Sequence, residues 1–127
     1  MRTVAYRILL MAFFLLDVVG CTDTKSLPGS YKLERLGDNK TYYLLGPSQQ
    51  DGEGGGLIDG TVLRLAWNDV VIGAERLSTF RGDPDGWMII DIKSGKISGP
   101  ISKLEFEIFL TKYQLQVKEV DQAWNEL

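Results

Sequence analysis

The fold is decided by residues 61–77, which read Thr-Val-Leu-Arg-Leu-Ala-Trp-Asn-Asp-Val-Val-Ile-Gly-Ala-Glu-Arg-Leu. Hydrophobic side chains recur at every second position on both sides of Asn68 and Asp69, as they do in strands with one buried face. Asn and Asp tolerate the positive φ that tight hairpin turns require. The stretch therefore predicts an antiparallel hairpin, Thr61–Trp67 and Val70–Leu77, with a two-residue turn.

Other short apolar segments flank this hairpin. Alternating side chains in Tyr31–Arg35 and Thr41–Leu45, separated by the turn residues Gly37–Lys40, predict a second hairpin. Trp87–Ile92 is so apolar that we expect a central strand covered on both faces.

The spacing of apolar residues changes after Pro100. Ser102 with Glu105 three residues later forms a capping box, which predicts a helix over Lys103–Tyr113 with an apolar arc broad enough to pack on a sheet. A short extended piece and a last helical turn or two follow, within 115–127. The sequence thus predicts an α+β fold, an antiparallel sheet of five or six strands with a C-terminal helix packed on one face.

Composition excludes several classes of function. The chain has 127 residues, 14 Lys and Arg, 17 Asp and Glu, and no histidine, so its formal charge is −3. The length and the 44 % hydrophobic content suit one globular domain. Without histidine there is no Ser-His or Cys-His nucleophile pair and no imidazole zinc site. The acidic balance argues against nucleic acid as a partner.

The first 20 residues predict a secretory signal peptide. Arg2 and Arg7 supply a positive start, and Ile8–Leu16 is an uninterrupted apolar run. Nine helical residues rise only about 13 Å, whereas about 20 apolar residues are needed to span a bilayer. The run is therefore too short for a membrane span.

Val18-Val19-Gly20-Cys21 follows the apolar run and contains the only cysteine of the chain. This segment resembles the lipobox of bacterial lipoproteins. The resemblance implies cleavage between Gly20 and Cys21, a diacylglyceryl group on the Cys21 thiol and an acyl group on the new amino terminus. We expect no other cofactor.

The same resemblance implies a location. Two or three acyl chains on Cys21 would anchor the chain stably at a membrane, which is the first expected partner. Thr22, rather than Asp, follows the cysteine, and in a Gram-negative envelope this favours the outer membrane, facing the periplasm. Loss of Arg2, Arg7 and Asp17 with the signal leaves 12 basic and 16 acidic residues, a net charge of −4.

The predicted domain organisation has three parts. Residues 1–20 are the signal peptide, 21–29 a lipidated flexible tether that is polar and ends in Pro-Gly, and 30–127 the α+β domain. Within that domain, 46–56 contains no apolar residue, so we expect a flexible loop.

Aromatic residues are the candidates for a binding surface, because Tyr and Trp supply large contact areas at small entropic cost. A place in the core is the competing and favoured interpretation for each of them. The candidates are Tyr31, Tyr42, Tyr43, Trp67, Trp87 and Trp124.

No metal or phosphate site is predicted. Asp83, Asp85 and Gly86 resemble the start of a calcium loop, but Ser94 stands where the bidentate carboxylate is needed. The glycines at 54–56 lack the Lys and Ser or Thr of a phosphate loop.

Carboxylates could serve a small hydrolase if two of them shared a pocket. Asp91 interrupts the most apolar strand, so we expect it either exposed at an edge or paired with Arg64 or Arg76. The candidate carboxylates are Asp69, Glu75, Asp83, Asp85 and Asp91.

The leading hypothesis is a non-catalytic envelope lipoprotein that binds an envelope protein or another macromolecule. One version is an immunity or inhibitor protein against a basic toxin or enzyme, which predicts an acidic patch beside exposed aromatics. A carboxylate hydrolase requires a pocket holding two carboxylates. A purely structural component predicts no pocket and a self-complementary surface.

Overall fold

A computed structural model of the chain describes residues 22–49, 56–78 and 83–127. The predicted signal peptide, the predicted cleavage and lipid attachment site at Gly20 and Cys21, and most of the predicted loop at 46–56 lie outside these residues. The elements in chain order are β1 (Asp23–Ser26), a 3₁₀ turn η1 (Pro28–Ser30), β2 (Lys32–Arg35), β3 (Tyr42–Leu45), β4 (Gly60–Trp67), β5 (Val71–Ser78), β6 (Gly86–Asp91), β7 (Ile97–Ile101), α2 (Lys103–Tyr113), β8 (Lys118–Glu119) and α3 (Val120–Glu126).

The strands form two antiparallel sheets, a small one in the order β1-β2-β3 and a large one in the order β7-β6-β5-β4-β8. The α+β class, the five-stranded sheet and the helix on one of its faces are confirmed. The second sheet is an addition to the predicted fold, because it needs β1, whose residues carry no apolar alternation.

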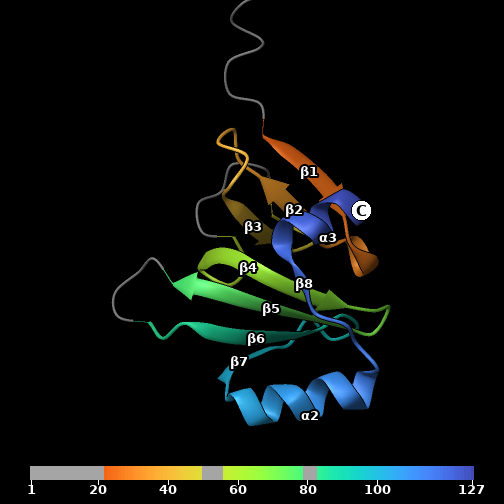
Figure 1. The fold of residues 1–127 in the computed structure, drawn as a ribbon. Coiled ribbons are helices and arrows are strands. Elements are labelled where there is room, and N and C mark those ends of the chain that lie inside the picture. The colour runs from red at the N-terminus through yellow and green to blue at the C-terminus, as the bar shows by residue number, and fades with distance from the viewer. Residues whose placement is uncertain (1–21, 50–55, 79–82) are drawn as a thin grey trace, which may run out of the picture.

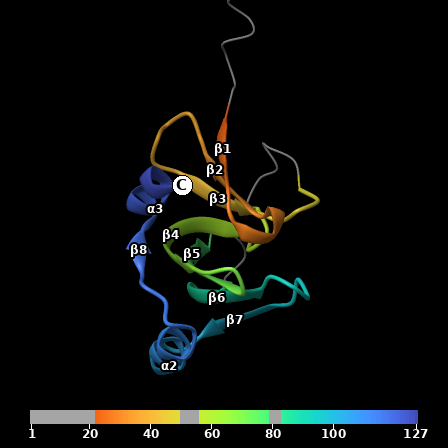
Figure 2. The ribbon, with the colours of Figure 1, turned by 90° about the vertical axis from the view of Figure 1, so that its right-hand side faces the viewer.

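The large sheet is the middle layer of the molecule (Figures 1 and 2). One of its faces packs against the small sheet and α3, and this interface holds the main core, including Leu33, Leu44, Leu65, Ile72 and Ile90. The other face is covered by α2 and holds a smaller aromatic cluster. Strand β6 contributes to both clusters, as predicted for a strand covered on both faces.

Both predicted hairpins are present, but the turn between β4 and β5 differs from the prediction. Neither Asn68 nor Asp69 has a positive φ. Instead, Asn68 Oδ1 accepts hydrogen bonds from the backbone N–H groups of Val70 (2.8 Å) and Val71 (3.0 Å). The strands therefore pair Trp67 with Ile72, and the loop is longer than two residues.

Helix α2 has the predicted bounds, and Ser102 caps it by accepting a hydrogen bond from the Glu105 backbone N–H at 3.1 Å. Its apolar arc is narrower than predicted. Only Phe106 and Phe109 are buried, whereas Leu104 and Ile108 are 68 % and 60 % exposed. The helix therefore contacts the sheet along one row of side chains and presents aliphatic residues to solvent.

The predicted flexible tether is wrong for residues 23–29. Strand β1 pairs with β2 along its whole length, from Asp23 opposite Arg35 to Ser26 opposite Lys32. Leu27 is buried in the main core, which anchors the strand from its other end. Edge strands with polar side chains are held by backbone pairing, and hydrophobic patterning does not reveal this.

Candidate functional site

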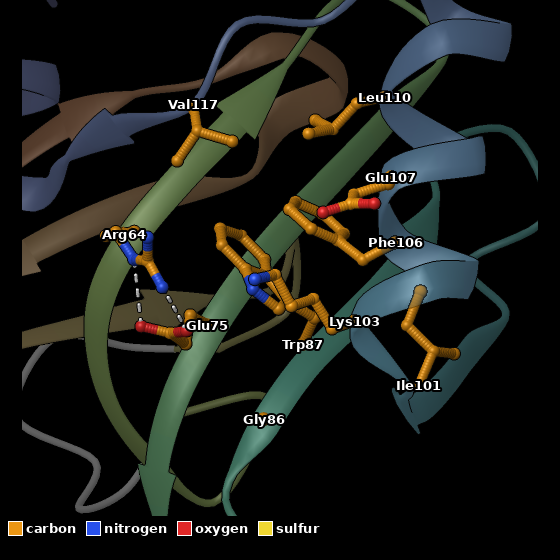
Figure 3. Close-up of a pocket in the computed structure, with 10 residues that line it drawn as sticks. All are labelled: Arg64, Glu75, Gly86, Trp87, Ile101, Lys103, Phe106, Glu107, Leu110 and Val117. Atoms are coloured by element: carbon orange, nitrogen blue, oxygen red, sulfur yellow. Dashed lines mark hydrogen bonds and ion pairs between the residues drawn. The ribbon is translucent and has the colours of Figure 1, made fainter.

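The candidate site is a groove of about 410 Å³ between α2 and the large sheet. Figure 3 shows Arg64 and Glu75 on the sheet side, Phe106 and Glu107 on α2, and Trp87 between them. The volume lies within the range typical of small-ligand sites. The lining residues are Arg64, Glu75, Gly86, Trp87, Ile101, Lys103, Phe106, Glu107, Leu110 and Val117.

Aromatic packing builds the base of the groove. The ring of Trp87 on β6 stacks on Phe106 of α2, with centroids 3.7 Å apart and planes inclined by 11°. Phe109 continues this row along the helix. A Cβ atom on Gly73 of β5 would lie 3.3 Å from the Phe109 ring and 3.4 Å from the Phe106 ring, so a residue without a side chain lets α2 approach the sheet closely.

An ion pair forms the sheet wall. Arg64 on β4 lies directly opposite Glu75 on β5, and its Nε and Nη2 atoms donate to the two carboxylate oxygens at 3.0 and 2.7 Å. These hydrogen bonds raise the pKa of the Arg64 guanidinium above its ordinary value. The guanidinium carbon also lies 5.5 Å from the Trp87 ring centroid, a cation–π distance.

The rim carries charges of both signs. Lys103 and Glu107 are exposed on α2 and line the groove opposite the Arg64–Glu75 pair. An apolar base with separate cationic and anionic groups suits a ligand that has an apolar body and polar ends. The bidentate contact from Arg64 occupies both carboxylate oxygens of Glu75.

The structure does not gather the predicted aromatic residues into one surface. Trp87 lines the groove but is largely buried, and Tyr42 packs edge-on against Trp124 in the main core, with centroids 5.8 Å apart. Tyr43 and Trp67 are half-buried, and Trp67 lies beneath the Lys118 ammonium at 5.2 Å. Tyr31 is buried too.

The prediction for Asp91 fails in part. Neither Arg64 nor Arg76 bonds to it, since Arg64 pairs with Glu75 and Arg76 donates to backbone carbonyls. Asp91 instead accepts hydrogen bonds from the Ser94 backbone N–H (2.8 Å) and hydroxyl (2.9 Å) in the turn after β6. These bonds, the backbone one first, lower the pKa of the Asp91 carboxyl.

The remaining candidate carboxylates lie outside the groove. Asp85 accepts a hydrogen bond from the Ser78 backbone N–H at 2.7 Å, which is a loop contact, and Asp69 lies exposed in the β4–β5 turn. Asp83 is exposed as well. Within the described ranges no three His, Cys, Asp or Glu residues are grouped so that they could hold a metal ion.

The Arg64–Glu75 ion pair is not predicted from the sequence, because the predicted turn gives a different strand register. A two-residue turn at 68–69 would place Arg64 opposite Gly73, whereas the observed turn places it opposite Glu75. The longer turn depends on the Asn68 side chain, which also donates to the Tyr113 carbonyl at 3.2 Å and so ties the turn to the end of α2. An Asx turn at Asn68 is the signal that could have corrected the register.

No protein-family model, curated protein or solved structure matches this chain. Among the helices in the described part of the chain, none has the length and apolar character to cross a bilayer.

Proposed function

We propose that this chain is a lipid-anchored, non-catalytic binding protein of a bacterial cell envelope, and that the α2 groove is its binding site. The lipobox resemblance at Val18–Cys21 supports the anchor. The observation that carries the binding role is the groove itself, where the Trp87–Phe106 stack lies beside a bidentate ion pair. The proposed ligand is a small amphipathic molecule or the side chains of an envelope protein.

A hydrolase function has one observation in its favour, because Glu75 and Glu107 both line the groove. A hydrolase of this kind needs one carboxyl group to hold a proton and donate it. Two hydrogen bonds from Arg64 occupy both carboxylate oxygens of Glu75 and hold this side chain against the sheet. Glu107 lies exposed to solvent on the helix surface. The groove therefore supports binding better than acid–base catalysis.

Inhibition of a basic toxin and a purely structural role receive less support. An inhibitor of a basic toxin would present an acidic patch beside exposed aromatics, but the groove carries both signs of charge. Among the described residues, the exposed large hydrophobic side chains are all aliphatic: Leu63, Val70, Leu77, Ile97, Leu104 and Ile108. A purely structural component would have no groove.

Metabolic labelling with a palmitate analogue tests the anchor. We expect label on the wild-type chain in its bacterial host and none on Cys21→Ala, with the wild type in the membrane fraction. Cys21→Ser, which keeps the size of the side chain, serves as the matched control and must also remain unlabelled. Equal labelling of wild type and Cys21→Ala would refute the anchor.

Site-specific photo-crosslinking tests the groove. A photoreactive residue at Lys103 lies on the groove rim, whereas one at Lys93 lies in the exposed turn after β6. In intact cells we expect a discrete adduct from position 103 and none of the same mass from position 93. The adduct should disappear in a chain that also carries Phe106→Ala. The same adduct from both positions would rule out the groove as the site.

A further inference from the structure

We infer that the N-terminal end of the small sheet is a membrane-contacting face, with the β2–β3 turn resting on the lipid headgroups and the α2 groove pointing away from the bilayer. This inference rests on the proposed lipid anchor at Cys21. It concerns the orientation of the domain, which the anchor alone would leave open.

The segment between the proposed anchor at Cys21 and the first strand of the domain is very short. A single residue, Thr22, separates Cys21 from β1. Consecutive Cα atoms are about 3.8 Å apart, so the Cα atoms of Cys21 and Asp23 lie within about 8 Å of each other. A tether over 21–29 would have reached roughly 25 Å and left the domain free to rotate.

The first residues after the anchor are themselves held by the sheet. Asp23 pairs with Arg35 in the β1–β2 register, and the two side chains form an ion pair at 3.4 Å. The Thr22 hydroxyl donates to the carboxylate of Glu34, which is buried, at 3.3 Å. The anchor point therefore moves with the small sheet.

The β2–β3 turn lies at this same end, because it begins directly after Arg35. Gly37–Lys40 are exposed, and the Asp38 carboxylate braces the turn by accepting from the Lys40 and Thr41 backbone N–H groups, both at 2.9 Å. This makes the turn a fixed polar projection beside the anchor.

The charges of this face suit a headgroup layer. The exposed Asp23 and Asp38 are balanced by the half-buried Arg35 and the exposed Lys40. A balanced set of surface charges neither repels a zwitterionic headgroup layer nor depends on anionic lipid for attraction. The occupant of this face is therefore the surface of the bilayer that holds the anchor.

The groove lies at the opposite end of the molecule. Figures 1 and 2, which are related by a turn about the vertical axis, both place β1 at one end and α2 at the other. With the small sheet on the headgroups, α2 and its exposed Leu104 and Ile108 face the aqueous compartment, where a partner can reach them.

Lipid-headgroup quenching tests the orientation. Acylation of Cys21 removes the chain's own thiol, so Lys40→Cys and Lys112→Cys each give the mature protein a single labelling site. Both positions are exposed, in the β2–β3 turn and on α2 respectively. The acylated proteins, labelled with a fluorophore, are reconstituted in phosphatidylethanolamine–phosphatidylcholine vesicles that carry nitroxide on the headgroup. We expect severalfold stronger quenching at position 40 than at position 112.

A flexible Gly-Ser insert of eight residues between Cys21 and Thr22 is the matched variant and should bring the two positions close to equal. If the proteins are acylated and float with the vesicles, but both positions are quenched equally without the insert, the orientation is wrong and the anchor stands. If the proteins are not acylated and do not float, both the orientation and the anchor fail.

Discussion

Arg76 shows what a buried charge does in this small domain. It is 7 % exposed, and its Nη1 atom donates to the Ile58 carbonyl at 2.6 Å while Nη2 donates to the Pro84 carbonyl at 3.1 Å. The guanidinium thereby joins the segments before β4 and β6, although the sequence suggested only a partner for Asp91. Backbone carbonyl oxygens accept the hydrogen bonds of the guanidinium.

Replacing Arg76 by Met should lower the free energy of unfolding by about 3 kcal/mol, because hydrogen bonds from a charged donor are lost and the Ile58 carbonyl stays buried. Urea denaturation monitored by circular dichroism measures this change. Lys93→Met removes a cation from an exposed turn and should alter stability by less than about 0.5 kcal/mol. Equal effects of the two substitutions would contradict the assigned role of Arg76.

Asp38 gives the fold a pH dependence of known sign. Hydrogen bonds from the Thr41 hydroxyl, then from the Lys40 and Thr41 backbone N–H groups, lower its pKa below the ordinary value of 3.8. A group whose pKa is lower in the folded state stabilises the fold fully above its ordinary pKa, and that contribution is lost as the pH falls through the lowered value. The lowered pKa of Asp91 acts in the same direction.

We therefore expect the free energy of unfolding to fall from about pH 5 to about pH 2. Asp38→Asn keeps an acceptor in the turn but does not titrate, so its stability should fall less steeply than that of the wild type. Denaturation midpoints across this range measure the slopes, and the carbon chemical shift of the Asp38 carboxyl gives its pKa directly. A pKa at or above 3.8 would be inconsistent with the observed turn.

At the scale of elements, α2 was predicted correctly from the sequence and β1 was not. The start of α2 follows from Ser102, whose side chain accepts a hydrogen bond from the Glu105 backbone N–H. This signal lies within the helix segment itself, so it can be read from the sequence. Strand β1 reads Asp-Thr-Lys-Ser and becomes a strand only because β2 offers it an open edge. Tertiary structure decides which segments pair, and the sequence of a short polar segment does not indicate its partner.

Helix α2 contacts the sheet through few side chains, so the contribution of each to the stability of the domain can be measured. Phe106 is buried against Trp87, while Ile108, two residues later, is 60 % exposed. Phe106→Ala should destabilise the domain by about 3 kcal/mol or more, because a large buried ring is replaced by a cavity.

The matched change Ile108→Ala should cost about 1 kcal/mol or less, since the side chain already faces water. Urea denaturation ranks the two variants, and the fluorescence of Trp87 should shift towards that of exposed tryptophan in Phe106→Ala alone. The reverse ranking would mean that α2 packs through its other face.

At the scale of the molecule, the groove depends on features that no single segment contains. Trp87 was a candidate from its residue type, and Glu75 was a candidate carboxylate. Glu75 lies opposite Trp87 in the β5–β6 register and opposite Arg64 in the β4–β5 register, and the absence of a side chain at Gly73 lets α2 dock on that face. Each of these contacts joins residues of different elements, and periodicity within one segment does not determine them.

The domain boundary is the prediction that belongs to the molecule as a whole. The polar composition before Ser30 predicts a boundary there, whereas β1 contributes an edge to the small sheet and Leu27 contributes to the main core. Lys25 also donates to the Trp124 carbonyl at 2.8 Å and lies 4.8 Å from the Trp124 ring centroid, so β1 holds α3 in place. Removing β1 therefore affects both ends of the chain.

A chain of residues 30–127 should be less stable than one of residues 22–127 by at least about 2 kcal/mol, the contribution of burying one leucine side chain. Urea denaturation of the two chains gives the difference. Leu27→Ala in the 22–127 chain isolates the core contribution, and the remaining loss in the 30–127 chain then reports the strand pairing and the contact with α3. If both chains unfold at the same urea concentration, residues 22–29 are the flexible tether that their composition indicates, and the fixed orientation at the membrane fails with them.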